Sequence, residues 1–207
     1  MKIVIIDYQM SNMFSVKNAL DKIGIQNSIS SNPEDLYDAD GAILPGVGSF
    51  PEAMFQLNKL NLTNAIINFV NSKKPFMGIC LGLHLLFSES FEFTKTKGLN
   101  IIDGIVKKIE NKKYNIKIPH VGWNKVLSNN NINMNNKKIF EDEFYYFVHS
   151  YYVEPKDSSV INSTTKYGGR KFCSSILQEN IFACQFHPEK SGKVGIEIFK
   201  NFFLKNN

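Results

Sequence analysis

A cysteine between two glycines is the part of the sequence with the clearest chemical meaning. The segment Gly78-Ile79-Cys80-Leu81-Gly82 joins an aliphatic run to a stretch with helical spacing. This is the layout of a nucleophile elbow with cysteine in place of serine, because glycines two residues to either side leave room for a tight strand-to-helix turn. Free N–H groups at the start of the helix favour the thiolate, and the Leu81 N–H can point at a developing oxyanion. We interpret Cys80 as a nucleophile rather than as a buried structural cysteine.

A thiolate that attacks an acyl carbon needs a base that can also protonate the leaving group, and histidine is the usual residue. His187 follows an expected strand, and Glu189 stands two residues later, so both side chains project to one side of an extended chain. The carboxylate can then orient the imidazole through its second nitrogen. Of the other histidines, His84 can reach the site. We interpret His120 and His149 as structural. The residues alone indicate a Cys–His–Glu acyl transferase or hydrolase.

The first half of the chain is expected to position these residues through alternating strands and helices. Strands are expected at 2–6, 41–44 and 75–80, and a helix is expected after each of them. The first helix carries Met13, Val16, Leu20 and Ile23, the second is capped by Thr63, and the third covers 81–88. Such alternation predicts an α/β fold with an open, mostly parallel twisted sheet and helices on both faces. Active groups then lie at the carboxyl ends of the strands.

After about Gly98 the pattern changes to short strands separated by turns. We expect antiparallel strands at 101–109, 114–118, 144–152, 159–162 and 172–177, then a strand at 181–186 and a helix with Ile196, Phe199 and Phe203 on one face. An antiparallel β region therefore extends the parallel sheet. No linker or internal repeat divides the chain, so we expect one domain over residues 1–207.

The composition excludes several other classes of protein. Of the 207 residues, 43% are hydrophobic, which is enough for a core without a metal or disulfides. The net charge of +5 comes from dispersed lysine pairs without an aromatic-lined basic stripe, so no nucleic-acid partner is expected. No apolar run approaches the length of a membrane span, and the cysteines lack C-x-x-C spacing. We expect a cytoplasmic protein with no cofactor, no metal and no membrane contact.

Segments of specific sequence follow one another in a fixed order along nearly the whole chain. They are Asp7-Tyr8, Pro45-Gly46-Val47-Gly48-Ser49-Phe50, the elbow at 78–82, Pro119-His120-Val121-Gly122-Trp123-Asn124, Tyr146-Phe147-Val148-His149-Ser150-Tyr151 and Gln185-Phe186-His187-Pro188-Glu189-Lys190-Ser191-Gly192. With these segments the chain resembles the class I, triad-type glutamine amidotransferases. Within that family it is most similar to the glutaminase subunits of imidazole glycerol phosphate synthases.

The resemblance implies that the chain hydrolyses L-glutamine to glutamate and ammonia. Cys80 would form a glutamyl thioester, His187 would release ammonia and then activate water, and Glu189 would orient His187. Substrate contacts would come from His84, from Glu92 to the α-ammonium group, and from the backbone of the segment with Tyr146, His149, Ser150 and Tyr151 to the α-carboxylate.

The resemblance also implies an oxyanion hole that is completed only on demand. Its groups would be Gly46, Val47, Gly48 and Leu81. In this family a peptide of the strand at 45–48 flips before its N–H points inward. An unformed hole keeps the triad poorly active until the partner subunit is ready.

Ammonia must reach its acceptor without being protonated by water, so a sealed interface with a second subunit is implied. In the family that subunit is a cyclase with a (β/α)8 barrel, and the two form a heterodimer that acts in histidine biosynthesis. Asn12, Trp123 and Lys190 match positions that face the cyclase. Without the resemblance, Trp123 would be interpreted as a core aromatic residue.

Departures from the family pattern leave the partner open. Gln9 and Ser11 replace two glycines of the family, and His84 replaces a glutamine. The alternative is therefore a paralogous glutaminase that delivers ammonia to a sugar-modifying synthetase in surface-polysaccharide biosynthesis. A noncatalytic binding subunit is a third possibility, which the intact Cys80, His187 and Glu189 disfavour.

Overall fold

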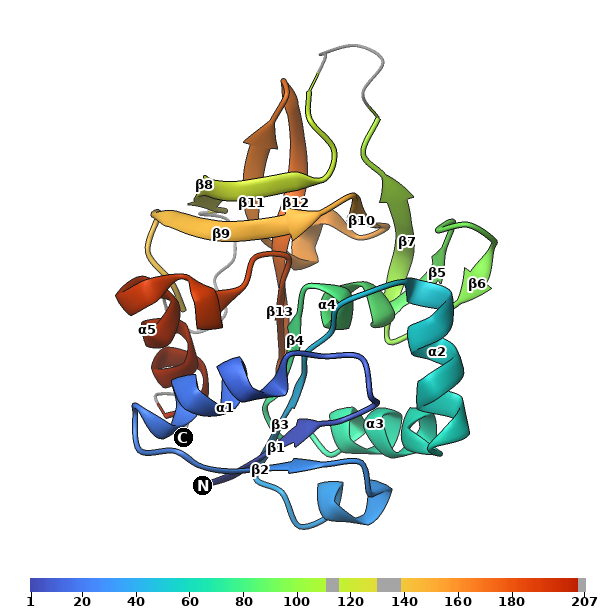
Figure 1. The fold of residues 1–207 in the computed structure, drawn as a ribbon, viewed down its shortest axis with the longest axis vertical. Coiled ribbons are helices and arrows are strands. Elements are labelled where there is room, and N and C mark those ends of the chain that lie inside the picture. The colour runs from blue at the N-terminus through green and yellow to red at the C-terminus, as the bar shows by residue number, and fades with distance from the viewer. Residues whose placement is uncertain (111–115, 130–138, 205–207) are drawn as a thin grey trace.

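Parallel strands form the centre of the molecule (Figure 1). The computed structural model describes residues 1–110, 116–129 and 139–204. The parallel strands are β1 (Lys2–Ile6), β2 (Gln26–Ser30), β3 (Gly41–Leu44), β4 (Phe76–Ile79) and β13 (Ile181–Cys184). They lie side by side in the order β2-β1-β3-β4-β13. Apart from β2 their residues are almost all buried, as is typical of a parallel sheet covered on both faces.

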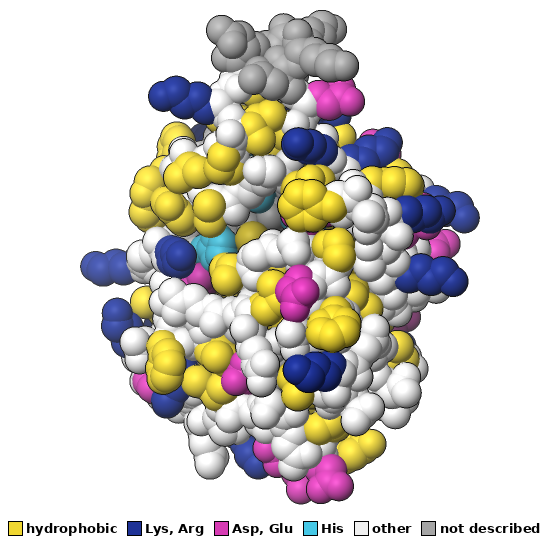
Figure 2. Space-filling view, turned by 45° about the vertical axis from the view of Figure 1, so that its right-hand side comes forward, with side chains coloured by type: hydrophobic (Ala, Val, Ile, Leu, Met, Phe, Trp, Pro, Cys, Tyr) yellow, Lys and Arg dark blue, Asp and Glu magenta, His cyan; other side chains and the backbone are white. Residues whose placement is uncertain are grey.

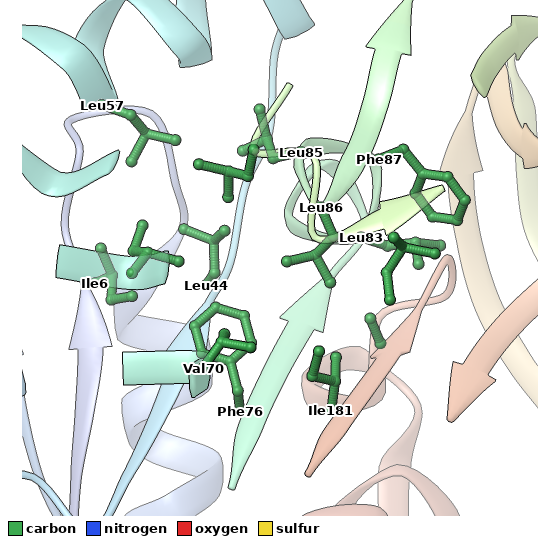
Figure 3. Close-up of a cluster of buried hydrophobic side chains, with 14 of the residues drawn as sticks. Ile6, Leu44, Leu57, Val70, Phe76, Leu83, Leu85, Leu86, Phe87 and Ile181 are labelled. Carbon is green, nitrogen blue, oxygen red and sulfur yellow. The ribbon is translucent and has the colours of Figure 1, made fainter. Parts of the chain in front are cut away.

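Helices cover both faces of these strands. The helices are α1 (Met13–Asp21), α2 (Phe50–Lys59), α3 (Leu62–Asn71), α4 (Leu81–Leu85) and α5 (Gly192–Phe203), with short 3₁₀ helices η1 (Pro33–Leu36), η2 (Ser158–Val160) and η3 (Pro188–Lys190). Val4 and Ile6 of β1 belong to the cluster that contains α2 and α3, part of which is drawn in Figure 3. Ile3 and Ile5 belong to the cluster with α1 and α5. Alternate residues of one strand thus fill two layers, and the expected α/β architecture is confirmed.

Mostly antiparallel β structure extends the sheet, with one parallel pair, β5 with β7. Its strands are β5 (Phe87–Ser90), β6 (Thr96–Lys97), β7 (Ile102–Lys108), β8 (His120–Ser128), β9 (Phe144–His149), β10 (Tyr151–Pro155), β11 (Ile161–Tyr167) and β12 (Arg170–Gln178). Strand β12 pairs with β13 and joins this region to the parallel strands, after which the order is β12-β10-β7-β5-β6. Strand β11 links β12 to β8, which pairs with β9. The carboxyl ends of β4 and β13 therefore lie beside the β8–β9 pair (Figure 1).

Some element boundaries differ from those expected. The helix expected at 81–88 ends at Leu85, and β5 starts at Phe87. Residues 81–87 are all buried, so their apolar spacing could not distinguish a helix from a strand. The strand expected over 144–152 is interrupted at Ser150, and this break lies in the candidate site.

Polar sequences account for other differences. Strand β2 was not expected because Gln, Asn and Ser dominate it, which suits an edge strand that pairs with β1. Helix α3 begins at Leu62 after Asn61, so Thr63 lies inside the helix rather than at its cap. Helix α2 was also not expected. The strand expected at 114–118 lies partly outside the described residues, and residues 116–118 are not in a strand.

Candidate active site

The cysteine elbow has the geometry that its glycines predict. Strand β4 ends at Ile79, and Cys80 adopts φ 54° and ψ −107° directly before helix α4. A Cβ atom on Gly82 would lie 1.8 Å from the Leu44 carbonyl oxygen, and one on Gly78 would lie 3.0 Å from the Gly82 carbonyl oxygen. Only glycine permits this close approach of the turn to strand β3. The strained backbone turns the Cys80 side chain into a cavity.

His187 and Glu189 form the base and its orienting carboxylate. His187 Nδ1 lies 2.7 Å from Glu189 Oε1, and both side chains are 3% exposed. The backbone N–H of His187 donates to the Tyr146 carbonyl. Helix η3 then turns the chain so that the Glu189 carboxylate faces the His187 ring. Burial lowers the pKa of the His187 imidazole, but the charge and hydrogen bonding of Cys80 and Glu189 outweigh burial and raise that pKa to about 10. The pair therefore favours a protonated imidazole beside Cys80.

A cavity of about 410 Å³ opens in front of Cys80. Its lining includes Val47, Gly48, Cys80, Leu81, His84, Glu92, His149, Ser150, Tyr151 and His187 from the sequence-based set, together with Phe93, Lys108 and Val148. In Figure 2 a histidine is visible in a hollow bordered by hydrophobic side chains. The volume is that of a small-molecule site. Gly46, Tyr146 and Glu189 do not line it, and Glu189 acts from behind His187.

The segment at 45–48 follows strand β3 and is called the oxyanion strand below. It turns one N–H away from the cavity. The Val47 N–H donates to the Met10 carbonyl at 2.9 Å. Gly48 has φ 99°, and a Cβ atom there would lie 2.8 Å from Met10 Cε. The Met10 backbone and side chain therefore both hold this strand, and the Val47 N–H is occupied in this structure.

His84 connects to Cys80 through a residue that the sequence analysis did not single out. His84 Nε2 lies 2.7 Å from Gln185 Oε1, and Gln185 Nε2 lies 3.8 Å from Cys80 Sγ. Burial lowers the pKa of His84 to about 4, so the ring is neutral at pH 7 and donates from Nε2. The signal for Gln185 was its polar side chain within the apolar run at 181–186.

His149 lines the cavity, yet both of its ring nitrogens are used within the protein. Nδ1 lies 2.7 Å from the Tyr151 carbonyl oxygen and therefore donates, so Nε2 accepts from His120 Nδ1 at 2.9 Å. His120 Nε2 lies 3.3 Å from Asn124 Nδ2. Burial lowers the pKa of His120 to about 4 and, as the main cause, that of His149 to about 3. These rings are neutral structural groups whose nitrogens are paired within the protein. A contact of His149 with substrate would therefore come from its backbone, as the resemblance implies.

The cavity lining contains an acidic and a basic side chain, Glu92 and Lys108. The Glu92 carboxylate is 8% exposed and accepts the Phe50 N–H at 2.8 Å. Burial raises the pKa of Glu92, and the hydrogen bond from the Phe50 N–H offsets only part of this rise. Lys108, the last residue of β7, lies opposite Tyr151 in the sheet. No ion pair of Lys108 occurs among the described residues, so its ammonium group is available to a ligand.

The residues expected to face a partner do not line the cavity, and two of them lie beside Tyr146. The Trp123 and Tyr146 rings meet edge to face at 6.2 Å, and Lys190 Nζ lies 6.0 Å from the Tyr146 ring. Trp123 is 55% exposed, so its interpretation as a core aromatic residue would be wrong. Asn12 is exposed at the start of α1. The Tyr146 side chain belongs to this outer group, so the substrate contact that the resemblance implies for Tyr146 concerns its backbone alone.

Within the described residues, no cluster of side chains has the make-up of a metal site, and no helix has both the length and the apolar character needed to span a membrane.

Comparisons with known proteins agree with this geometry. The family model for glutamine amidotransferase class-I matches residues 4–206. The imidazole glycerol phosphate synthase subunit HisH of Syntrophotalea carbinolica is 44% identical over 97% of this chain and 98% of its own length. The HisH subunit of Aquifex aeolicus is 43% identical over 99% of this chain and 97% of its own length.

Solved structures show the same fold. A chain in the PurLQS structure from Thermotoga maritima superposes with a TM-score of 0.74 at 19% identity, covering 100% of this chain and 99% of that chain. A structure described as a glutamine amidotransferase gives a TM-score of 0.69 at 14% identity, covering 98% and 97%. The elbow, the buried His–Glu pair and the full-length match lead to one conclusion: this chain belongs to the class-I glutamine amidotransferase family.

Proposed function

We propose that this chain is the glutaminase subunit of an imidazole glycerol phosphate synthase, in which it hydrolyses L-glutamine and supplies ammonia for histidine biosynthesis. The observation that carries the proposal is the buried His187–Glu189 pair, 2.7 Å apart, beside a cysteine on a strained strand-to-helix turn. HisH relatives that are 44% identical over 97% of the chain support this assignment. Residues 1–207 would act as one glutaminase domain in the cytoplasm.

Cys80 would attack the side-chain amide carbon of glutamine as a thiolate. The C–N bond then breaks, and the His187 imidazolium gives its proton to the departing nitrogen, which leaves as ammonia. Neutral His187 next takes a proton from water, and the resulting hydroxide attacks the thioester to release glutamate. Glu189 keeps Nδ1 protonated and Nε2 directed at the reacting atoms.

The oxyanion formed in both steps would need two N–H donors. Leu81, directly after the nucleophile, supplies one from the start of α4, as in other nucleophile elbows. Val47 would supply the other, but its N–H is held by Met10. Turning this peptide would therefore be the step that links partner binding to glutamine hydrolysis.

Glutamine is a zwitterion, and the cavity offers one group for each charge. Glu92 would bind the α-ammonium group, and Lys108 would bind the α-carboxylate. The break between β9 and β10 at Ser150 places backbone groups of Ser150 and Tyr151 at the same wall. This arrangement would hold the side-chain amide near Cys80.

The outer face of β8 and β9 would bind the cyclase barrel. Its outward apolar side chains are unusually exposed: Val121 56%, Trp123 55%, Leu127 47% and Phe144 53%. Register places them on one face, because Trp123 lies opposite Tyr146 and Lys125 lies opposite Phe144. An apolar patch of this kind indicates a protein interface. Lys190 and Asn12 would extend it in a heterodimer.

A sugar-modifying synthetase remains the second candidate for the partner. Gln9 has φ 67°, a left-handed conformation that glycine adopts without strain, and its side chain is exposed. It directly precedes Met10, whose carbonyl holds Val47. The chain thus departs from the family at the loop that controls the oxyanion strand.

Replacement of the nucleophile tests the proposed function. Cys80→Ala should abolish glutamine-dependent synthesis by the complex and leave synthesis from ammonium salt intact, because only the ammonia source is lost. Cys173→Ala, which removes a buried thiol elsewhere, should retain both activities. Glutaminase activity that survives in Cys80→Ala would falsify the assignment, and a wild-type chain without glutaminase activity in any complex would indicate a noncatalytic subunit.

A glutamine-like diazo ketone gives a second, direct test. It should label Cys80 and leave Cys173 and Cys184 unmodified, because burial raises the pKa of Cys173 to about 12 and raises the pKa of Cys184 well above its usual value. Even labelling of the three cysteines in a peptide map would contradict selective activation of Cys80.

A further inference from the structure

The hydroxyl group of Tyr8 is buried without a hydrogen-bond partner. Tyr8 is 0% exposed, and its Oη atom has no partner within the described residues. Burial, and secondarily the nearby charge of Cys80, raise the pKa of Tyr8, so the hydroxyl keeps its proton and remains a donor. Buried hydroxyls almost always find an acceptor, so an unpaired one calls for a reason.

This hydroxyl lies directly behind the oxyanion strand. A Cβ atom on Gly46 would lie 2.1 Å from Tyr8 Oη, so Oη touches the Cα side of Gly46. The same Cβ position is 2.9 Å from Leu81 Cβ and 3.3 Å from the Gly82 nitrogen. Tyr8 therefore reaches a place where the oxyanion strand and the start of α4 meet. Glycine at 46 is needed to leave room for it.

The peptide that joins Gly46 to Val47 is the part of the strand that would move. Its N–H now donates to Met10, away from the cavity. If that N–H turns to face Cys80, the Gly46 carbonyl on the same peptide turns the opposite way, toward the side on which the Met10 carbonyl now accepts the Val47 N–H. The Met10 carbonyl repels another carbonyl, whereas the Tyr8 hydroxyl, which is in contact with Gly46, can donate to it.

We propose that Tyr8 is a positioning residue for the oxyanion hole: its hydroxyl donates to the Gly46 carbonyl when the Gly46–Val47 peptide turns its N–H toward Cys80. This inference rests on the proposed function, since it concerns the same hole. In the resting arrangement Tyr8 Oη is unpaired and Val47 is paired with Met10; in the turned arrangement the Tyr8 bond replaces the lost Val47 bond. One buried donor thus makes the active arrangement accessible.

Tyr8→Phe tests the inference because a structural defect and a positioning defect have opposite effects. The variant should unfold at the same temperature as the wild type or a higher one, since it loses no hydrogen bond of the resting structure. In the complex, its glutaminase kcat should fall about tenfold with KM nearly unchanged, which corresponds to about 1.4 kcal/mol in the transition state.

Hydrogen exchange of the Val47 amide gives a readout that needs neither partner nor activity. The turned peptide exposes this amide, so Tyr8→Phe should slow its exchange about tenfold by depopulating that state. A merely structural role for Tyr8 would make exchange faster. The matched control is Tyr145→Phe, in a tyrosine that is also 0% exposed. It removes a hydroxyl that donates to the Glu141 carbonyl and should lower stability without affecting Val47 exchange or kcat.

Unchanged or faster Val47 exchange in Tyr8→Phe overturns the inference, as does an unchanged kcat. Loss of kcat together with a lower unfolding temperature also overturns it, because that combination indicates a packing role. If the wild-type complex hydrolyses no glutamine, the proposed function fails and the catalytic part of the inference fails with it, whereas slower exchange would still support the Tyr8–Gly46 contact.

Discussion

His84 donates a hydrogen bond from Nε2 to Gln185 Oε1 across 2.7 Å, and this bond ties helix α4 to the chain that follows β13. Gln185 is fully buried, and its amide nitrogen faces the Cys80 sulfur at 3.8 Å. The histidine that replaces a family glutamine is therefore connected to the nucleophile as well as to the cavity. Its effect on catalysis should extend beyond substrate affinity.

Substitution of His84 tests this connection. His84→Gln should keep most glutaminase activity, because a side-chain amide can still donate to Gln185 Oε1. His84→Leu leaves that buried oxygen unpaired, which costs on the order of 1–3 kcal/mol, so kcat should fall about fivefold or more along with any rise in KM. Steady-state kinetics of the complex separate the two constants. Equal kinetics for the leucine variant would return His84 to a packing role.

The bond between Val47 and Met10 predicts a glutaminase that is nearly inactive alone. Adding the cognate synthase with its acceptor substrate should raise glutamine turnover, because a partner that prefers the turned strand shifts the equilibrium toward it. Turnover is measured with the cyclase of the same organism and, separately, with any sugar-modifying synthetase encoded nearby. Stimulation by the synthetase alone would reject the histidine-pathway assignment.

Trp123 supplies the matched interface variant for that experiment. Trp123→Ala should weaken the stimulation, because it removes the most exposed aromatic side chain of β8. Phe55→Ala removes a comparably exposed aromatic side chain, 58% exposed, from helix α2 on another part of the molecule and should leave stimulation unchanged (Figure 1). Equal effects of the two variants would place the interface elsewhere.

The parallel sheet and the elbow could be predicted because each depends on local sequence. Short aliphatic runs indicate buried strands. The glycines around Cys80 reflect contacts that exclude a Cβ atom: a Cβ atom on Gly82 would lie 1.8 Å from the Leu44 carbonyl oxygen. The His187–Glu189 pair is also local, since its members are two positions apart in the chain. These features need no knowledge of tertiary contacts.

Groups brought together by the antiparallel region could not be predicted in the same way. Lys108 reaches the cavity because β7 pairs with β10, a register that no local pattern specifies. Gln185 acquires its position from a contact with a residue 101 positions earlier in the chain. The pairing of His120 with His149 likewise depends on the β8–β9 register. Long-range register therefore sets the limit of sequence reasoning here.

Lys108 should contribute to glutamine affinity rather than to chemistry. Lys108→Met removes the proposed partner of the substrate α-carboxylate, so KM should rise about two- to fivefold while kcat changes little, as suits a solvent-accessible ion pair. Lys107→Met is the control, because that neighbouring lysine pairs with Glu154. The same KM for both variants would remove Lys108 from the substrate site.

The buried histidines predict a loss of stability in mild acid. The pKa of His84 and of His120 is lowered to about 4 and that of His149 to about 3, in each case mainly by burial, from an ordinary value of 6.5. Below pH 6.5 these histidines bind protons in the unfolded chain but stay unprotonated in the folded chain. The stability that these groups contribute is therefore complete above pH 6.5 and declines as the pH falls toward 4.

Urea unfolding between pH 7 and pH 4.5 measures this dependence. Each histidine that is protonated in the unfolded chain and neutral in the folded chain adds a slope of about 1.4 kcal/mol per pH unit to the free energy of unfolding. His84→Gln removes one titrating group and keeps a donor to Gln185, so its curve should be flatter than that of the wild type by up to one proton. Above pH 7 the two curves should run parallel. His187 does not contribute in this acid window, because its raised pKa leaves it protonated in both states below pH 6.5. Parallel curves over the whole range would show that His84 accepts a proton in the folded protein.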